Sequence, residues 1–301
     1  MNEEPMPARR TAALSGFGTL RIAGADALAF LQGQFTQDTR LLADGRTQLS
    51  ACCTNQGRVV AVVRFRLVDD AVHALLPAAL VPRLGAHLRK FVLRAKVEVT
   101  APADVQLFGI WTATGDGPAP QGVDASAPSS PPPRAWPQAV SFEWARGRRL
   151  VVAAAGTFPA DSMPDATGAD AAWRACDIAD GLATVDETST ENFTPQMLNL
   201  DLVDGVSFSK GCYTGQEIVA RTHHLGRVKR RTMRFVLPAG PAPAPLANLM
   251  RDGAKAADVL MAVALPDRVE LLAVTNLDAA GQTLLAEDGR AAVPATLPYA
   301  V

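Results

Sequence analysis

The sequence predicts an α+β protein with antiparallel sheets, followed by a small all-β domain at the C-terminal end. Strand-like and helix-like segments alternate with short turns through the first part of the chain, which argues against a parallel nucleotide-binding fold. No Gly-rich phosphate loop is found. From about residue 232 onward, short apolar segments are separated by Pro- and Gly-rich turns, a pattern typical of a β-barrel or sandwich.

The first hundred residues hold many of the predicted elements. Residues 14–24 alternate apolar with small or polar side chains and indicate a strand, and Asp26 then stands at the expected N-cap of a helix. Two later strands flank a turn in which Gly57 can adopt a positive φ. The predicted helices cover 27–35 and 78–91, and the further strands cover 47–53, 58–68, 71–77, 95–101 and 105–113.

Residues 114–137 differ in composition from the rest of the chain. Pro, Gly, Ala and Ser dominate the segment, which cannot bury enough apolar surface to offset its ordering entropy, so we expect a linker. The linker would join two lobes, 1–113 and 138–231, of one domain, and the barrel would occupy 232–301. In the second lobe we expect strands at 139–144 and 149–154 and a helix over 169–179.

The overall composition sets broad limits on the class of protein. Of 301 residues, 48% are hydrophobic and 20% are charged, so the chain can bury a core. The formal net charge of -1 excludes a strongly basic protein that coats nucleic acid with its whole surface. We expect no signal peptide and no transmembrane helix, because no apolar run approaches about eighteen residues.

The four cysteines predict reduced thiols in a cytoplasmic protein. Cys52 and Cys53 are adjacent, and neighbouring cysteines rarely bridge each other. No Cys-x-x-Cys pair or Cys/His cluster suggests a metal site, so we expect no stably bound metal. Cys52 and Cys53 lie in a predicted strand and Cys176 in a predicted helix, and we interpret all three as structural.

The stretch SKGCYTGQE, residues 209–217, surrounds the fourth cysteine with residues that can make a thiol reactive. Thr214 and Glu217 have the spacing of a capping box, which predicts a helix start just after Cys212. The positive end of that helix and the nearby Lys210 would both favour a thiolate. The alternative is a small buried cysteine beside a solvated lysine, since free cysteine is among the most buried residue types.

A basic strip follows this stretch. Residues 221–234 contain six Arg and Lys residues and no acidic residue. The strip is either a solvated face or a site for a polyanion such as RNA phosphate or a polyglutamate tail. No aromatic residue alternates with the basic ones, so the sequence does not support base stacking. Arg227 and Arg230 are the candidates for an anionic ligand.

Residues 195–221, PQMLNLDLVDGVSFSKGCYTGQEIVAR, closely resemble the signature of the YgfZ family of folate-binding proteins. This family is related to the glycine-cleavage T-protein, an aminomethyltransferase, and includes a mitochondrial iron–sulfur assembly homologue. The signature Lys-Gly/Ala-Cys-Tyr/Phe-x-Gly-Gln-Glu is complete here. DALAFLQGQFTQD, NQGRVVAVVRF, LRKFVLRAKVEV and GRVKRR are similar to other family segments and come in the same order.

The resemblance implies a ring-like folate-binding domain followed by a small β-barrel. It implies that tetrahydrofolate or a derivative binds in a central cavity, and that the protein helps to build or repair iron–sulfur clusters of other enzymes, some of which modify tRNA. The expected partners are folate and iron–sulfur client or assembly proteins, and we expect no contact with a membrane. We also expect a monomer. Cys212 would be the functional thiol and Lys210 its partner; the binding candidates are Gly211, Tyr213, Gly215, Gln216, Glu217, Arg227 and Arg230.

Two departures from the T-protein argue against aminomethyl transfer. The turn that carries the T-protein's catalytic Asp corresponds to residues 56–61, QGRVVA, which contain no carboxylate. The segment that supplies a Glu to the pterin reads DIADG here, so that Glu is absent, and Asp177 or Asp180 is the available substitute.

Three hypotheses about function therefore remain open. The first is a folate-binding protein that uses Cys212 in iron–sulfur cluster maintenance and thereby in tRNA modification. The second is a folate-dependent one-carbon transferase with Cys212 as nucleophile or acceptor. The third is a tRNA-binding module that uses the basic strip of residues 221–234.

Overall fold

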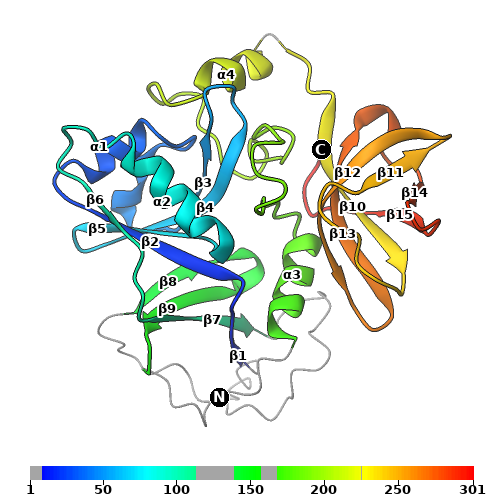
Figure 1. Cartoon of the computed structure of the whole chain (residues 1–301), viewed down its shortest axis with the longest axis horizontal. Helices are drawn as coiled ribbons and strands as arrows, with labels where there is room; N and C mark the ends of the chain where they lie inside the picture. Colours follow the sequence, from blue (N-terminus) through cyan, green and yellow to red (C-terminus); the bar gives the residue numbers. More distant parts are fainter. Residues whose placement is uncertain (1–8, 113–138, 157–167, 225) are drawn as a thin grey trace, which may run out of the picture.

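The computed structural model describes residues 9–112, 139–156, 168–224 and 226–301, and all statements about structure refer to these residues. Two antiparallel sheets and a closed barrel make up the molecule, with one helix, α3 (Ala169–Ala179), between the sheets and the barrel (Figure 1). This architecture confirms the predicted fold class.

The first sheet has five strands in the order β3-β4-β5-β2-β6. Its long apolar strand β4 is buried over its first five residues, because the sheet is covered on both faces there. The α2 helix contacts β2 and β6, and α1 contacts β5. The elements are β2 (Phe17–Ala23), β3 (Gln48–Cys53), β4 (Val59–Val68), β5 (Ala71–Pro77), β6 (Glu98–Thr100), α1 (Ala27–Gln32) and α2 (Val81–Arg89), with the short 3-10 turns η1 (Thr39–Asp44) and η2 (Ala78–Leu80).

The second sheet has four strands in the order β1-β7-β9-β8. Trp173 of α3 packs closely on this sheet: a Cβ atom at Gly109 would lie 2.8 Å from its ring. Since β9 pairs with β7, the chain on either side of residues 114–137 contributes to one sheet. The elements are β1 (Arg9–Ala13), β7 (Val105–Thr112), β8 (Val140–Glu143), the turn η3 (Ala145–Gly147) and β9 (Arg149–Ala154).

The C-terminal barrel closes in the order β10-β13-β12-β11-β14-β15. Its interior holds Phe235, Val259 and Leu271. On the outer face, Leu260 and Leu272 join the same hydrophobic core as the first sheet, so the barrel is firmly attached to the rest of the molecule. The strands are β10 (Arg230–Pro238), β11 (Asn248–Arg251), β12 (Ala254–Ala264), β13 (Arg268–Asn276), β14 (Leu284–Ala286) and β15 (Ala291–Ala295), with the turn η5 (Leu277–Ala279).

Most predicted elements are present, with local differences. The strands β1, β11 and β15 were not predicted, because they are short and β11 and β15 lack a long apolar run. Asp26 does precede α1, but its carboxylate accepts a hydrogen bond from Lys96 N at 2.7 Å and does not cap the helix. The predicted linker, 114–137, lies outside the described residues.

Candidate functional site

The stretch around Cys212 is a loop that leads into helix α4 (Gln216–His224). The predicted capping box does not form. The Thr214 amide donates to the Gly33 carbonyl at 3.1 Å, and the Glu217 carboxylate pairs with Arg221 at 2.7 Å. The helix therefore begins one residue after Gly215, and Glu217 is an exposed residue of its first turn.

Gly215 seats this loop on the turn between β3 and β4. Its φ is +83°, and a Cβ atom there would lie 2.4 Å from the Thr54 carbonyl oxygen and 3.0 Å from Gly57 Cα. Gly57 also has a positive φ, as the sequence predicts for this turn. Gly211, in contrast, has open space where a Cβ would lie, so the fold does not require a glycine there.

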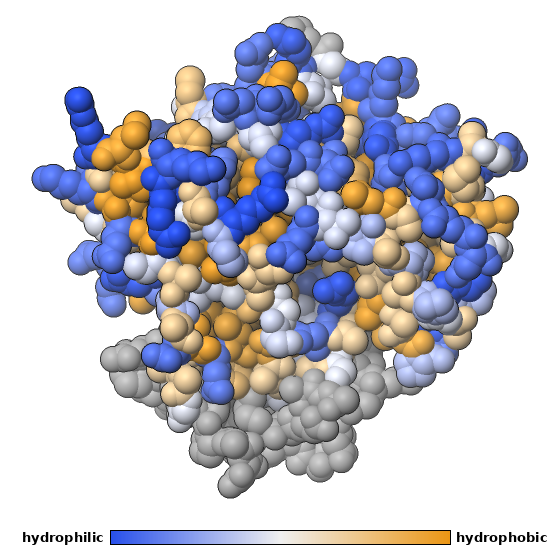
Figure 2. Space-filling view, viewed as in Figure 1, coloured by the Kyte–Doolittle hydropathy of each residue, from blue (hydrophilic) through white to orange (hydrophobic). Residues whose placement is uncertain are grey.

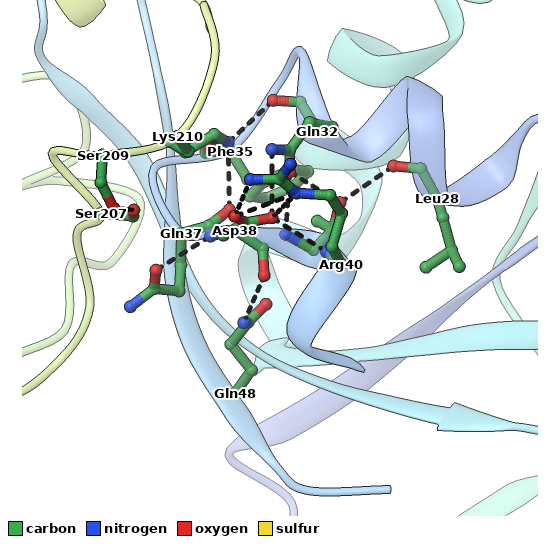
Figure 3. A network of polar contacts seen from close by, with 11 residues as sticks. Leu28, Gln32, Phe35, Gln37, Asp38, Arg40, Gln48, Ser207, Ser209 and Lys210 are labelled. Atoms are coloured by element: carbon green, nitrogen blue, oxygen red, sulfur yellow. Dashed lines mark hydrogen bonds and ion pairs between the residues drawn. The ribbon is translucent and has the colours of Figure 1, made fainter. Parts of the chain in front are cut away.

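Lys210 is buried, and its ammonium is bound by backbone carbonyls. Its ammonium donates to the carbonyl oxygens of Phe35, Gln32 and Gln37 at 2.6, 2.8 and 3.0 Å (Figure 3). Burial lowers the pKa of Lys210 to about 8, an effect that the nearby Asp38 opposes. An ammonium has three N–H donors, and all three are used. The predicted pairing of Lys210 with the Cys212 thiol is therefore replaced by a contact with the backbone.

Cys212 is exposed, whereas the predicted structural cysteines are covered. Cys52 and Cys53 are fully buried, and burial raises the pKa of both thiols, that of Cys52 to about 12. Cys176 is partly buried on α3, where burial also raises the pKa of its thiol. Among the four cysteines, only Cys212 is exposed to solvent.

Tyr213 and Gln216 stabilise the loop on the C-terminal side of Cys212. Tyr213 is buried, with its ring 4.9 Å from the Lys210 ammonium, and burial raises the pKa of its hydroxyl. The Tyr213 amide donates to Gln216 Oε1 at 3.3 Å. Tyr213, a binding candidate from the sequence, is thus a buried residue of this loop.

Separate from this loop, two cavities lie where the two sheets, α3 and the barrel meet. Both are lined by Phe17, Pro77, Asp177 and Thr184, so they adjoin. The first extends between the sheets to Arg64 and Trp144 and has an empty volume of about 460 Å³, open mouth included. The second extends to the barrel residues Leu260 and Met261. None of residues 209–217 lines either cavity.

A polar cluster forms one wall of the first cavity. Trp144 Nε1 and Arg148 Nη2 donate to Asp177 Oδ1 at 2.7 and 2.8 Å, and no described residue donates to Asp177 Oδ2. Burial raises the pKa of Asp177, while Arg148 opposes the shift. Asp180 is not a lining residue, and Arg146 and Arg148 each pair with one of its oxygens. Of the two candidate substitutes for the absent Glu, only Asp177 therefore faces the cavity.

Arg64 completes this wall. Its guanidinium lies 3.8 Å from the centre of the Trp144 ring, and no described residue accepts a hydrogen bond from it. Burial lowers the pKa of Arg64 to about 10, and Asp177 opposes this shift. Neither Arg64 nor Trp144 was predicted from the sequence to belong to the site. A charged residue inside the apolar run VVAVVRF was the available signal, because a buried charge needs a partner.

Most of the basic strip is paired within the protein. The guanidiniums of Arg230, Arg231 and Arg234 bind the carboxylates of Asp258, Asp201 and Glu270. Arg230 is thus occupied, whereas Arg227 and Lys229 are exposed and have no acidic partner in the described part of the chain. Around α4, at the top of Figure 2, the surface is mostly hydrophilic.

Two features are absent from the described residues, a metal-binding cluster and a membrane-spanning helix. No group of three His, Cys, Asp or Glu side chains is arranged to hold a metal ion. No helix in these segments is long and apolar enough to cross a membrane.

Comparisons with known proteins agree on one family. No family model matches the sequence. The tRNA-modifying protein YgfZ of Hamiltonella defensa is 31% identical over 72% of this chain and 67% of the relative. The YgfZ protein of Sodalis glossinidius is 30% identical over 96% of this chain and 92% of the relative. That of Yersinia enterocolitica is 29% identical over 90% and 86%, respectively.

Among solved structures, aminomethyltransferase T of the glycine cleavage system from Bartonella henselae superposes with a TM-score of 0.70. The superposition covers 97% of this chain and 86% of that chain, at 17% sequence identity. At this identity the likeness shows the fold, which is the one that the sequence resemblance implied.

Proposed function

Because this chain belongs to the family of the tRNA-modifying protein YgfZ, we propose that it is a tetrahydrofolate-binding protein that supports tRNA modification through iron–sulfur cluster assembly or repair. In this proposal the central cavity holds the folate, and Cys212 is the functional thiol. The two act at different places, since Cys212 does not line the cavity.

The observation that carries the folate assignment is the polar wall of the first cavity. A pterin is a flat ring with adjacent N–H donors on one edge and with acceptors elsewhere. Asp177 Oδ2 is open to such donors, and Arg64 can donate to an acceptor. Phe17 and Trp144 supply aromatic surface for an apolar ring face. The residues present therefore fit a folate.

The exposure of Cys212 supports its role toward an external partner. A thiol on the surface can reach a cluster, a persulfide or a thiol of another protein, whereas a thiol in the cavity would be limited to small molecules. The one-carbon transferase alternative needs a nucleophile beside the folate. Since Cys212 lies outside both cavities and residues 56–61 contain no carboxylate, the geometry favours the cluster-maintenance role.

The tRNA-binding alternative is weakened by the pairing of the basic strip. Three of its six cations bind carboxylates of the barrel or of the adjoining turns, and Arg221 pairs with Glu217. Two exposed cations, Arg227 and Lys229, leave little charge for a phosphate backbone, whose neutralisation dominates the affinity of such complexes.

Asp177→Asn tests the folate site, because it keeps the shape of the side chain and the acceptor for Trp144 and Arg148 but replaces the open Oδ2 with a donor. We expect the affinity for 5-formyltetrahydrofolate, measured by calorimetry, to fall about ten-fold or more, as for the loss of one charge-assisted hydrogen bond. Unchanged affinity in the variant, or no binding to the wild-type protein, would refute the assignment.

Cys212→Ser is the matched variant for the thiol. We expect it to bind folate like the wild-type protein and to fail to support an iron–sulfur tRNA-modifying enzyme in a strain that lacks the native protein. If Cys212→Ser supports that enzyme fully, the thiol has no role in the function.

A further inference from the structure

We propose that Lys210 is a positioning residue, whose buried ammonium fastens the loop that carries Cys212 to the segment of residues 32–37. Residues 207–214 are named the thiol loop, and residues 32–37 the anchor segment. This inference rests on the proposed function, since it takes the Cys212 thiol as the working group. It assigns to Lys210 the presentation of that thiol and not its ionisation.

The carbonyl contacts of Lys210 are the first line of support. The oxygens of Gln32, Phe35 and Gln37 converge on Nζ at 2.6–3.0 Å, and Lys210 is only 6% exposed. Figure 3 shows the side chain reaching from the thiol loop into the turn of the anchor segment. The ammonium belongs to the thiol loop and all three carbonyls belong to the anchor segment, so these charge-assisted hydrogen bonds join the two segments.

Backbone hydrogen bonds at both ends of the thiol loop are the second line of support. Ser207 N donates to Thr36 O at 2.9 Å, and Thr214 N donates to Gly33 O at 3.1 Å. Lys210 lies between these two contacts. The exposed Gly211 and Cys212 follow it directly, so the thiol lies next to the fastened point.

The anchor segment is itself held in shape independently of Lys210. Gln32 Oε1 accepts from Thr39 N at 2.8 Å, and Gln32 Nε2 donates to Asp38 Oδ1 at 3.1 Å. The Thr36 hydroxyl donates to Gly205 O at 2.6 Å. The carbonyl oxygens are therefore directed by their own surroundings, and the ammonium meets a preformed site.

Hydrogen exchange of the full-length protein tests the role of Lys210. In Lys210→Ala we expect the Ser207 and Thr214 amides to exchange about ten-fold faster or more, because the loop opens locally. Addition of propylammonium chloride should restore their protection, with sodium chloride at equal ionic strength as the salt control. Lys229→Ala removes an exposed lysine and should leave both amides unchanged.

The rate of Cys212 alkylation by iodoacetamide separates positioning from ionisation. If Lys210 only positions the thiol, the pH midpoint of alkylation stays the same in Lys210→Ala while amide exchange speeds up. A raised midpoint with unchanged exchange would overturn the proposal, and so would wild-type exchange in the variant.

A measurement on the wild-type protein covers the case in which Lys210→Ala does not fold. The Lys210 ammonium, held by three carbonyls, should give a slowly exchanging NH₃⁺ signal in ¹⁵N-resolved NMR; its absence would also overturn the proposal. The proposed function fails if Cys212→Ser still supports the tRNA-modifying enzyme. That result would not alter the amide exchange rates of Lys210→Ala, so the two failures can be told apart.

Discussion

Asp38 is the residue that organises the polar side of the anchor segment. Its carboxylate accepts from the Arg40 guanidinium, from Arg40 N at 3.0 Å and from Gln32 Nε2 at 3.1 Å. The side-chain hydrogen bond from Arg40 is the largest influence on it and lowers the pKa of Asp38 to about 2, below its ordinary value of 3.8. The charged form is thus favoured in the folded state.

This shift predicts a pH dependence of stability. A depressed folded-state pKa contributes stability that is present above the ordinary value of 3.8 and is lost as the pH falls toward 2. Asp38→Asn should therefore lower the free energy of unfolding at pH 5 by more than at pH 2.5, measured by urea denaturation. Asp70→Asn, in an exposed turn, controls for the loss of one carboxylate. An equal effect of Asp38→Asn at both pH values would contradict the prediction.

At the scale of elements, the contact between the β3–β4 turn and the thiol loop depends on Gly215. A side chain there would need both a rare backbone conformation and space that the Thr54 carbonyl occupies. Gly57 of the turn and Gly215 of the loop are 158 residues apart in sequence, so the sequence alone does not predict this contact.

Two glycines of the same motif give a matched pair of variants. Gly215→Ala should destabilise the protein by about 2 kcal/mol or more, because the added Cβ meets backbone atoms and φ is positive. Gly211→Ala should change stability by less than about 0.5 kcal/mol, because the site is open. Denaturant unfolding measures both changes in the free energy of unfolding. Equal effects of the two substitutions would show that Gly215 is not sterically constrained.

At the scale of the whole molecule, the barrel is joined to the rest of the chain by a partly buried ion pair. Arg231 of β10 binds both oxygens of Asp201, at 2.6 and 2.9 Å, and also donates to Gln196 O at 3.0 Å. Tyr299, near the C-terminal end, donates to Gly181 O at 2.7 Å, just after α3. These contacts reinforce the apolar attachment through Leu260 and Leu272.

Removal of one partner of this pair should be costly. Arg231→Met leaves the partly buried Asp201 carboxylate without its cation, and we expect a loss of about 3 kcal/mol in the free energy of unfolding. Arg221→Met removes an exposed i,i+4 pair with Glu217 and should cost less than about 0.5 kcal/mol. Similar small losses in both variants would mean that the Arg231 pair does not hold the barrel in place.

Much of the fold was predictable because the signals are local. The strands of the first sheet, the helix over 169–179 and the barrel strands β12 and β13 follow from apolar periodicity and turn residues. The short strands β1 and β15 were missed, since their pairing with β7 and β10 comes from distant parts of the chain and not from their own five residues.

The sequence singled out candidate residues for the site, but it could not predict the contacts that these residues make. The motif around Cys212 was recognised from nine consecutive residues, and the exposure of that thiol is compatible with the proposed role. Lys210 was predicted to act beside the thiol, but its hydrogen-bond partners are carbonyls more than 170 residues away in sequence. Arg64 and Trp144 were missed, because their shared cavity exists only after two sheets meet.

The sequence by itself determined the fold class, the family and the position of a distinctive cysteine, because periodicity, turn chemistry and a complete motif are properties of neighbouring residues. Tertiary structure alone decided what each charged group does. It turned Lys210 into an internal anchor, placed Arg230 and Arg231 in ion pairs, and left Asp177 and Arg64 facing a cavity. A buried charge takes the partner that the folded chain brings to it, and sequence distance does not limit that choice.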